Sequence, residues 1–420
     1  MNTQNILFST LLFLFIFSFP ITYGVNSSYI AAIIAFFILA CSKKTRFHFK
    51  SLCRKKITII ILFFYIIMLV YSSLNTALLE QYDFTMQKTI VNGIFSYLIC
   101  IIIVSIFFGF FPTTAYLENS LSLVLIFQSI IIIVMLVSPE VRISIQNIIR
   151  TEEEINRMAA YDGVRGLGLS GSIAFGLAIT MGLLSYIFLT SLPKTSTFSS
   201  FTKVSVFILV FIASLSAGRT SILAFIMGFF YLLITSNRIN MFKVIIKYSM
   251  LFILVITISA YFLNEYSSLS PTIYRYSEYA FQPIINYLET GSFSVSSTER
   301  LSEMYFIPDN ESTIFVGDGK YSADDGTYYM NTDSGYLRFM LYFGVIGSII
   351  PYSAFLVFCL YSSSAAQMLS SQYKYFFILL ILMTIIFHYK AEVIFYNISY
   401  MKIVYLIGFY YILKSNIYRT

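Results

Sequence analysis

Long apolar runs alternate with short polar segments along almost the whole chain. A helix that crosses the hydrocarbon core of a bilayer needs about 20 mostly apolar residues, and its backbone polar groups must pair within the helix. The pattern therefore predicts an all-α integral membrane protein. We expect about twelve transmembrane helices, near residues 6–23, 28–41, 57–74, 89–111, 121–138, 171–192, 204–216, 222–235, 245–263, 335–360, 375–387 and 393–413.

One long polar segment interrupts this pattern, between residues 264 and 334. It contains eleven acidic residues and only three basic ones. Connections between helices usually need only a few residues, so a polar segment of this length is the first place to look for function. We divide the chain into residues 1–263 with nine spans, the polar loop 264–334, and residues 335–420 with three spans.

Charge along the short connections predicts the orientation. The connection between the second and third spans carries seven bases and no acid: Lys43, Lys44, Arg46, Lys50, Arg54, Lys55 and Lys56. Basic connections of this kind stay in the cytoplasm. Both termini are then cytoplasmic, and the loops 139–170 and 264–334 lie outside. Isoleucines at near-helical spacing in the first half of loop 139–170 favour a helix in the membrane interface.

Composition agrees with a membrane protein, with 58% hydrophobic and 11% charged residues against about 25% charged in soluble domains. The net charge of +7 lies mainly in the predicted cytoplasmic loops, which excludes nucleic acid as the expected partner. Four cysteines outside the acidic loop and two histidines indicate neither a disulfide framework nor a metal site. The first apolar run has no basic n-region, so we interpret it as a span and not a signal peptide.

Three arginines in the outer connections are candidate anion ligands, because a guanidinium donates two parallel hydrogen bonds to a phosphate. Arg219 lies between two apolar runs and is either an interface anchor or a phosphate ligand. Arg165 is flanked by glycines that allow a close backbone approach, and the alternative is a linker residue. Arg157 either binds substrate or pairs with Glu153 or Glu154.

The end of the polar loop contains the most specific stretch. Asp333 is expected to cap the helix of the tenth span, and a cap is compatible with catalysis. Arg338, one turn later, is expected near Asp333, as a structural ion pair or a substrate ligand. Arg300 in the loop, Tyr336 and His388 complete the candidate substrate-binding residues.

At these positions the chain resembles a known family, the O-antigen and capsule polymerases (the Wzy family), relatives of the O-antigen ligases (WaaL). The resemblance covers the whole architecture of spans with one large external loop. It rests on three local patterns: Arg165-Gly-Leu-Gly, Ser216-Ala-Gly-Arg219-Thr-Ser, and Gly317-Asp-Gly319 followed by Asp333-Ser-Gly-Tyr-Leu and Phe343-Gly-Val-Ile-Gly347. Ligases usually carry His-Asn where this chain has Asp333-Ser334, which favours a polymerase.

The resemblance implies a multi-pass enzyme of the bacterial cytoplasmic membrane that transfers glycans from undecaprenyl-diphosphate-linked oligosaccharide. Arg165 and Arg219 would bind the diphosphate, Arg300 or Arg338 would assist, and Asp333 would orient or deprotonate the acceptor hydroxyl. No cofactor is expected. Membrane lipid is an expected partner, and a polysaccharide chain-length regulator is a candidate partner.

Three other functions stay open at this point, and one of them is a generic transporter or a sensor with a ligand-binding loop. An O-antigen ligase would move finished glycan onto another acceptor. A lipid-linked oligosaccharide flippase would line its spans with charges, whereas here the spans hold few charges, chiefly Arg338 and Lys402.

Overall fold

The computed structural model describes most of the chain as helix. The described residues are 3–22, 24–111, 116–152, 154–155, 167–191, 200–236, 282, 286–287, 290–292, 296–323 and 327–418. Within them, strands are limited to an antiparallel pair, β1 (Pro20–Thr22) and β2 (Val25–Asn26), and one isolated bridge between Ser322 and Tyr328. The predicted all-α class is therefore confirmed.

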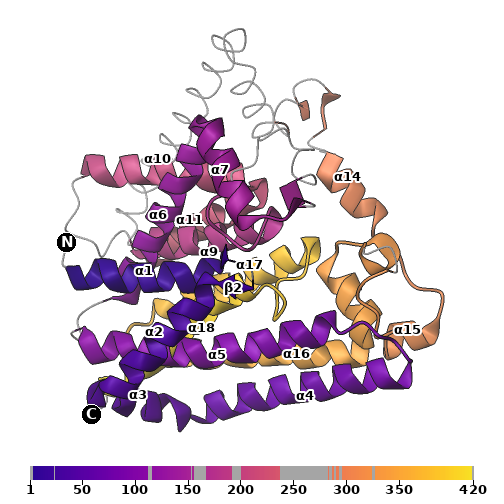
Figure 1. Cartoon of the computed structure of the whole chain (residues 1–420), viewed down its shortest axis with the longest axis horizontal. Coiled ribbons are helices and arrows are strands. Elements are labelled where there is room, and N and C mark those ends of the chain that lie inside the picture. The colour runs from indigo at the N-terminus through magenta and orange to yellow at the C-terminus, as the bar shows by residue number, and fades with distance from the viewer. Residues whose placement is uncertain are drawn as a thin grey trace. The chain divides into compact units, whose positions relative to one another are not determined.

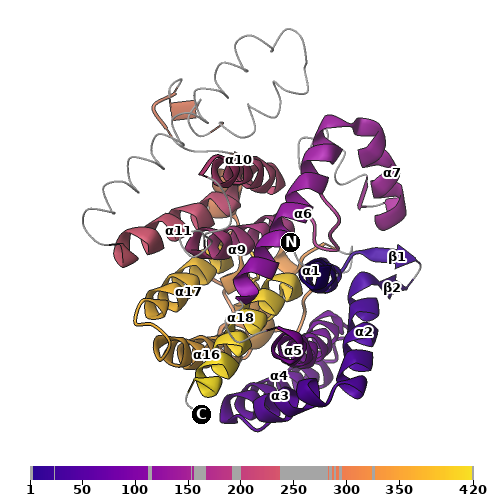
Figure 2. The same cartoon turned by 90° about the vertical axis from the view of Figure 1, so that its left-hand side faces the viewer.

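The chain forms two compact units. The first consists of Met1–Ala31 and Glu118–Ser296. Figure 2 shows three of its helices, α9, α10 and α11, lying together. The described elements of this unit are α1 (Thr3–Phe17), β1, β2, the start of α2 (Ser27–Cys41), α6 (Leu117–Val137), α7 (Pro139–Ile149), α9 (Phe175–Ser191), α10 (Ser200–Ala217), the 3₁₀ turn η2 (Arg219–Ser221) and α11 (Ile222–Thr235).

The second unit consists of Ala32–Leu117 and Ser297–Thr420. Long helices α4, α5 and α16 run side by side in it (Figure 1), and α18 packs on α5 and α16. Besides most of α2, its described elements are α3 (Lys43–Cys53), α4 (Lys56–Leu78), α5 (Thr85–Phe110), α14 (Ser296–Glu303), α15 (Glu311–Phe315), η3 (Tyr329–Asn331), α16 (Gly335–Gln367), α17 (Tyr373–Lys390) and α18 (Ile398–Ile417).

Five of these helices are long and apolar enough to cross a membrane: α4, α5, α6, α16 and α17. Shorter apolar helices α1, α2, α9, α10 and α11 coincide with other predicted spans. The multi-pass helical character is thus supported, while twelve spans and their orientation stay predictions. The ninth predicted span, residues 245–263, lies outside the described residues.

The basic connection after α2 differs from the prediction of a plain loop, because most of it forms helix α3. Ser42 caps this helix by accepting a hydrogen bond from Thr45 N at 3.2 Å. Thr45 and Leu52 are buried, and α3 packs against α5. An apolar stripe of so few residues is easily overlooked in a sequence dominated by lysine and arginine. In loop 139–170, by contrast, α7 confirms a helix in the first half, and its position in the membrane interface stays a prediction.

Helix α18 forms the core of the second unit. Nearly all its residues are buried, including Tyr405 and Phe409. The Tyr405 hydroxyl lies 2.9 Å from that of Tyr65 on α4, so two buried phenols satisfy each other. A helix whose residues are buried on nearly every side lies in the interior of its bundle.

Candidate functional site

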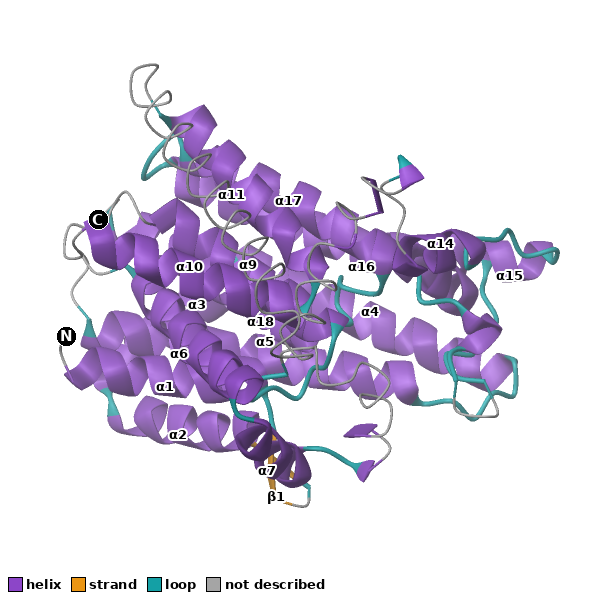
Figure 3. Ribbon diagram, turned by 90° about the horizontal axis from the view of Figure 1, so that it is seen from above, coloured by secondary structure: helices purple, strands orange, loops and turns teal. Residues whose placement is uncertain are grey.

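Helix α16 is interrupted near its start. Gly344 has a φ of 66° and a ψ of 175°, outside the helical region, so carbonyl groups of the preceding turn lose their helical partners. Asp318 N donates to Leu341 O at 2.7 Å, and Gly319 N donates to Tyr342 O at 3.3 Å. The broken helix therefore accepts the end of the polar loop as a backbone partner. Figure 3 shows α14 and α15 of this loop at the same end of α16.

Two glycines make this close backbone contact possible. Gly317 has a φ of 83°, and a Cβ there would lie 2.5 Å from Gly344 N. A Cβ on Gly344 would overlap the carbonyl oxygen of Phe315. Tyr71 of α4 also donates its hydroxyl to Phe343 O at 2.8 Å. The two glycine-containing motifs that the sequence singled out thus form one structural joint between loop and helix.

Arg338, one turn into α16, forms a buried ion pair with Glu392. Nε lies 2.7 Å from Oε1, and the two side chains are 3% and 4% exposed. Glu392 belongs to the turn between α17 and α18, which comes next to the start of α16 only in the folded chain. The structural ion pair expected of Arg338 is therefore present, but its partner is Glu392 and not Asp333.

Two aromatic rings, nearly perpendicular to each other, pack against the Arg338 guanidinium. Its central carbon lies 3.8 Å from the ring centroid of Tyr321 and 3.5 Å from that of Tyr328. Tyr396 stacks on Tyr321 with centroids 5.1 Å apart. Cation–π contacts of this kind contribute about 0.5 to 2 kcal/mol each. Among the described residues, Arg338 Nη1 has no hydrogen-bond partner.

Asp83, between α4 and α5, holds the loop segment that carries Tyr321. One of its carboxylate oxygens accepts hydrogen bonds from Tyr321 N at 2.9 Å and Ser322 N at 2.6 Å, and the other accepts from Thr85 N at 3.0 Å. Burial opposes ionisation, but these hydrogen bonds outweigh it and hold the pKa of Asp83 below its usual 3.8. The ionised carboxylate therefore anchors the ring that covers Arg338.

Asp333 directly precedes the helix that carries Arg338. Ser334 occupies the N-cap of α16, so the predicted cap is wrong by one residue, and Asp333 precedes it with an exposed side chain. Burial raises the pKa of Glu392, the Arg338 guanidinium lowers it, and the charge of Asp333 raises it further. An exposed carboxylate, a buried carboxylate and a buried guanidinium thus lie within electrostatic reach of one another.

His388 and Tyr336 support the same region from within the protein. The His388 ring is 0% exposed. Its Nδ1 accepts hydrogen bonds from Val393 N at 3.0 Å and Ile394 N at 3.4 Å, while Nε2 lies 3.2 Å from the Tyr352 hydroxyl. The ring of His388 is therefore buried with protein partners at both nitrogens, and its substrate-binding role stays a prediction.

Tyr336 is only half-buried. Its hydroxyl donates to the Ile385 carbonyl at 3.0 Å, and its ring lies 4.9 Å from that of His388. The ring therefore belongs to the wall of the cluster, and its predicted contact with substrate stays a prediction.

The remaining predicted arginines lie elsewhere or outside the described residues. In the first unit, Arg219 is in η2, half-buried, and its Nη1 donates to Gln282 Oε1 at 2.9 Å. Arg300 lies on α14 of the second unit. Arg157 and Arg165 lie outside the described residues. The structure thus brings Asp333, Tyr336, Arg338 and His388 together and leaves the other arginines as predictions.

Arg150, which the sequence did not single out, holds the segment that follows Arg165. It is 8% exposed and donates to the carbonyl groups of Ser170 and Gly171. Gly171 N in turn donates to Phe17 O at 2.7 Å, and a Cβ on Gly171 would overlap Ser18 O. The glycine-rich segment is therefore pinned at its end by backbone contacts with α1.

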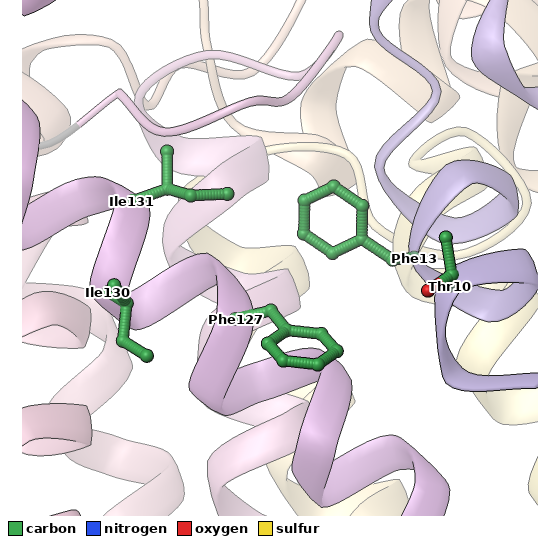
Figure 4. Close-up of a pocket in the computed structure, with 5 residues that line it drawn as sticks. All are labelled: Thr10, Phe13, Phe127, Ile130 and Ile131. Carbon is green, nitrogen blue, oxygen red and sulfur yellow. The ribbon is translucent and has the colours of Figure 1, made fainter. Parts of the chain in front are cut away.

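A groove of about 300 Å³ lies on the first unit between α1 and α6. Phe13, Phe127, Ile130 and Ile131 line it together with Thr10 (Figure 4), whose hydroxyl donates to Ile6 O. The lining offers no charged group for phosphate or sugar. Within the described part of the chain, no group of three or more His, Cys, Asp or Glu side chains is arranged to hold a metal ion.

Comparison with protein-family models, curated proteins and solved structures gave no match to this chain. Sequence reasoning missed Glu392, Asp83, Tyr321 and Tyr328 as members of the cluster. The one available signal was the Lys390–Glu392 charge pair in a short turn beside a span, since an acid so close to a span needs a partner.

Proposed function

We propose that this protein joins oligosaccharide repeat units, carried on polyprenyl (undecaprenyl) diphosphate, into O-antigen or capsular polysaccharide at the outer face of the cytoplasmic membrane. The observation that carries the proposal is the cluster at the start of α16. There an exposed carboxylate, Asp333, directly precedes the apolar helix α16, and a buried cation, Arg338, lies one turn into that helix in an ion pair with Glu392. A lipid-linked substrate has its reacting diphosphate and sugars at this same level, where lipid meets water.

The reaction makes specific demands on the protein. A hydroxyl of one repeat unit attacks the anomeric carbon of another, a new carbon–oxygen bond forms, and the bond to the diphosphate breaks. The hydroxyl proton passes to a base, and the diphosphate leaves with its lipid and both bonding electrons. Such a reaction needs a base or hydrogen-bond acceptor at the attacking hydroxyl and cations at the leaving group, and a carboxylate is a suitable base. It needs neither metal nor nucleotide sugar, because the donor already carries its leaving group.

We assign the base role to Asp333, whose side chain is exposed and able to meet a sugar hydroxyl. Arg338 is a cation within the same cluster. Arg165 and Arg219 are assigned to the diphosphate on the resemblance described above, with Arg300 and Arg157 as further candidates.

The first experiment is a gel of surface glycan from cells that lack the gene. A polymerase mutant displays single repeat units, so the ladder should collapse to one unit that still reaches the surface. Loss of all surface glycan would contradict the proposal and favour a ligase or a flippase. Membrane fractions then distinguish those two, because a flippase mutant accumulates lipid-linked units that face the cytoplasm.

Complementation of the deletion strain tests the assigned residues. Asp333→Asn removes the base with little change of size and should reduce polymer by about 100-fold, and Arg219→Ala should abolish long chains. Asp309→Asn is the matched control, since Asp309 is another exposed acid of the polar loop. Immunoblots of membranes confirm equal protein levels. Normal polymer from Asp333→Asn would contradict the assignment of the base.

A further inference from the structure

The buried ion pair has an unusual arrangement for a purely structural contact. Arg338 approaches Glu392 through Nε, 2.7 Å from an Oε1 that has no hydrogen-bond partner among the described residues, and its Nη2 makes only a long contact of 3.5 Å to Tyr321 O. Two parallel hydrogen bonds from both nitrogens of one edge would bind the carboxylate more strongly. The geometry used here leaves Nη1 without a partner among the described residues, although the side chain is 3% exposed.

Stability alone gives little reason to keep such a pair. Two charges lose their hydration when buried, and replacing a buried ion pair by apolar residues of similar volume is often neutral or stabilising. Removing only one partner is strongly destabilising, because the other charge stays buried and unpaired. The pair therefore indicates a use for the guanidinium beyond holding α16 in place.

Glu392 is itself held by a rigid turn. His388 Nδ1 accepts hydrogen bonds from two successive N–H groups of this turn, those of Val393 and Ile394. The backbone of α16 also lies directly against the turn, because a Cβ on Gly335 would be 2.7 Å from Ala391 O. The carboxylate thus has a defined position relative to the helix that carries Arg338.

We propose that Glu392 is a positioning residue, which acts on substrate through Arg338. It pairs with the Nε edge of the guanidinium beside the rings of Tyr321 and Tyr328, and Nη1, which has no hydrogen-bond partner among the described residues, is the donor left for a substrate oxygen. His388 positions the turn that carries Glu392. This inference rests on the proposed function, because the substrate is the lipid-linked repeat unit.

The test separates folding from activity with single and double substitutions. Purified protein is assayed with lipid-linked repeat units extracted from the deletion strain, which retains them unpolymerised. Glu392→Gln should lower kcat by about 100-fold with little change in KM, because a small displacement of an oriented group has effects of this size. Glu392→Asp, which keeps a carboxylate, should recover part of the rate. Glu392→Gln should also lower the unfolding temperature.

The double variant Arg338→Met with Glu392→Leu removes both charges. It should unfold at or above the wild-type temperature, because no unpaired charge stays buried, yet its rate should remain about 100-fold reduced. A double variant that polymerises like the wild type would overturn the inference and make the pair structural. If wild-type protein itself fails to polymerise and deletion leaves the ladder intact, the proposed function falls instead.

Substitutions of His388 test whether this residue positions the turn that carries Glu392. Asn places an amide oxygen near the position of Nδ1 and retains an acceptor for the two N–H groups, whereas Leu retains only the volume. His388→Asn should keep most of the rate, and His388→Leu should reduce kcat as Glu392→Gln does. Equal, wild-type rates in both variants would overturn the role of His388 in positioning the turn.

Discussion

Asp83 holds the ring of Tyr321 in position, although the two residues lie far apart in the sequence. The carboxylate accepts hydrogen bonds from Tyr321 N and Ser322 N, and Tyr321 covers Arg338. Because only the ionised form accepts all these bonds at full strength, the folded state lowers the pKa of this group. A group whose pKa is lowered on folding stabilises the fold above its unfolded pKa and loses that effect as pH falls through the folded pKa.

We therefore expect Asp83→Ala to destabilise the protein by about 1 to 2 kcal/mol near neutral pH. The difference in unfolding temperature between wild type and variant should shrink as pH falls below 3.8, the usual pKa of the group. Thermal unfolding of purified protein between pH 7 and pH 3 measures this. Asp309→Ala serves as control, and a difference for Asp83→Ala that is constant over this range would contradict the argument.

The identity of the partner of Arg338 could not be predicted at this scale. Spacing along a helix suggested Asp333, but a residue just before a helix points wherever the incoming chain directs it. Glu392 comes from a different turn, and only the packing of α16 against α17 brings it near. A local pattern contains no information about such a contact.

At the scale of elements, the joint between the polar loop and α16 depends on two glycines for two different reasons. Both Gly317 and Gly344 have positive φ, which other residues adopt at a cost of about 1 to 2 kcal/mol. Both also lie where a Cβ would collide with backbone atoms of the opposite segment. The sequence motif thus marks a place where two backbones touch.

Gly317→Ala and Gly344→Ala should therefore each destabilise the protein by about 3 kcal/mol or more, because steric overlap adds to the backbone strain. Gly24→Ala is the matched control, since Gly24 has a φ of 79° and open space around it. It should cost only about 1 kcal/mol. Protein yield and thermal unfolding measure the stability of the three variants. Equal losses of stability in all three would show that the positive φ, and not steric overlap, determines the cost.

The elements themselves were predicted well where apolar composition decided them. The predicted span at residues 222–235 coincides with α11, and the spans near residues 57–74 and 121–138 correspond to α4 and α6. Helix α3 was missed because its buried face consists of few residues among many lysines and arginines. The predicted span ended at residue 360, whereas α16 extends to Gln367. The extension was missed because its residues are more polar than those of the span.

At the scale of the whole molecule, the proposed function requires the polar loop and α3 to lie on opposite sides of the membrane. Cysteine labelling tests this in a background in which Cys41 and Cys53 are replaced by Ser. A membrane-impermeant maleimide should label Asp309→Cys in intact spheroplasts, and Lys44→Cys only after permeabilisation, because basic connections stay inside. Both sites are exposed. Labelling of Lys44→Cys from outside would contradict the topology and the outer-face reaction.

Apolar composition, turn residues and the distribution of charge were enough to predict a helical, multi-pass membrane protein and to point to the region around Asp333. These properties depend on the free energy of transferring each segment from water to lipid, and that free energy follows from the segment's own residues. Tertiary structure alone decided that Glu392 pairs with Arg338, that Asp83 holds Tyr321 against Arg338, and that His388 is buried. Buried charges and hydrogen bonds take their partners from whichever elements pack nearby, and that packing is a property of the whole fold.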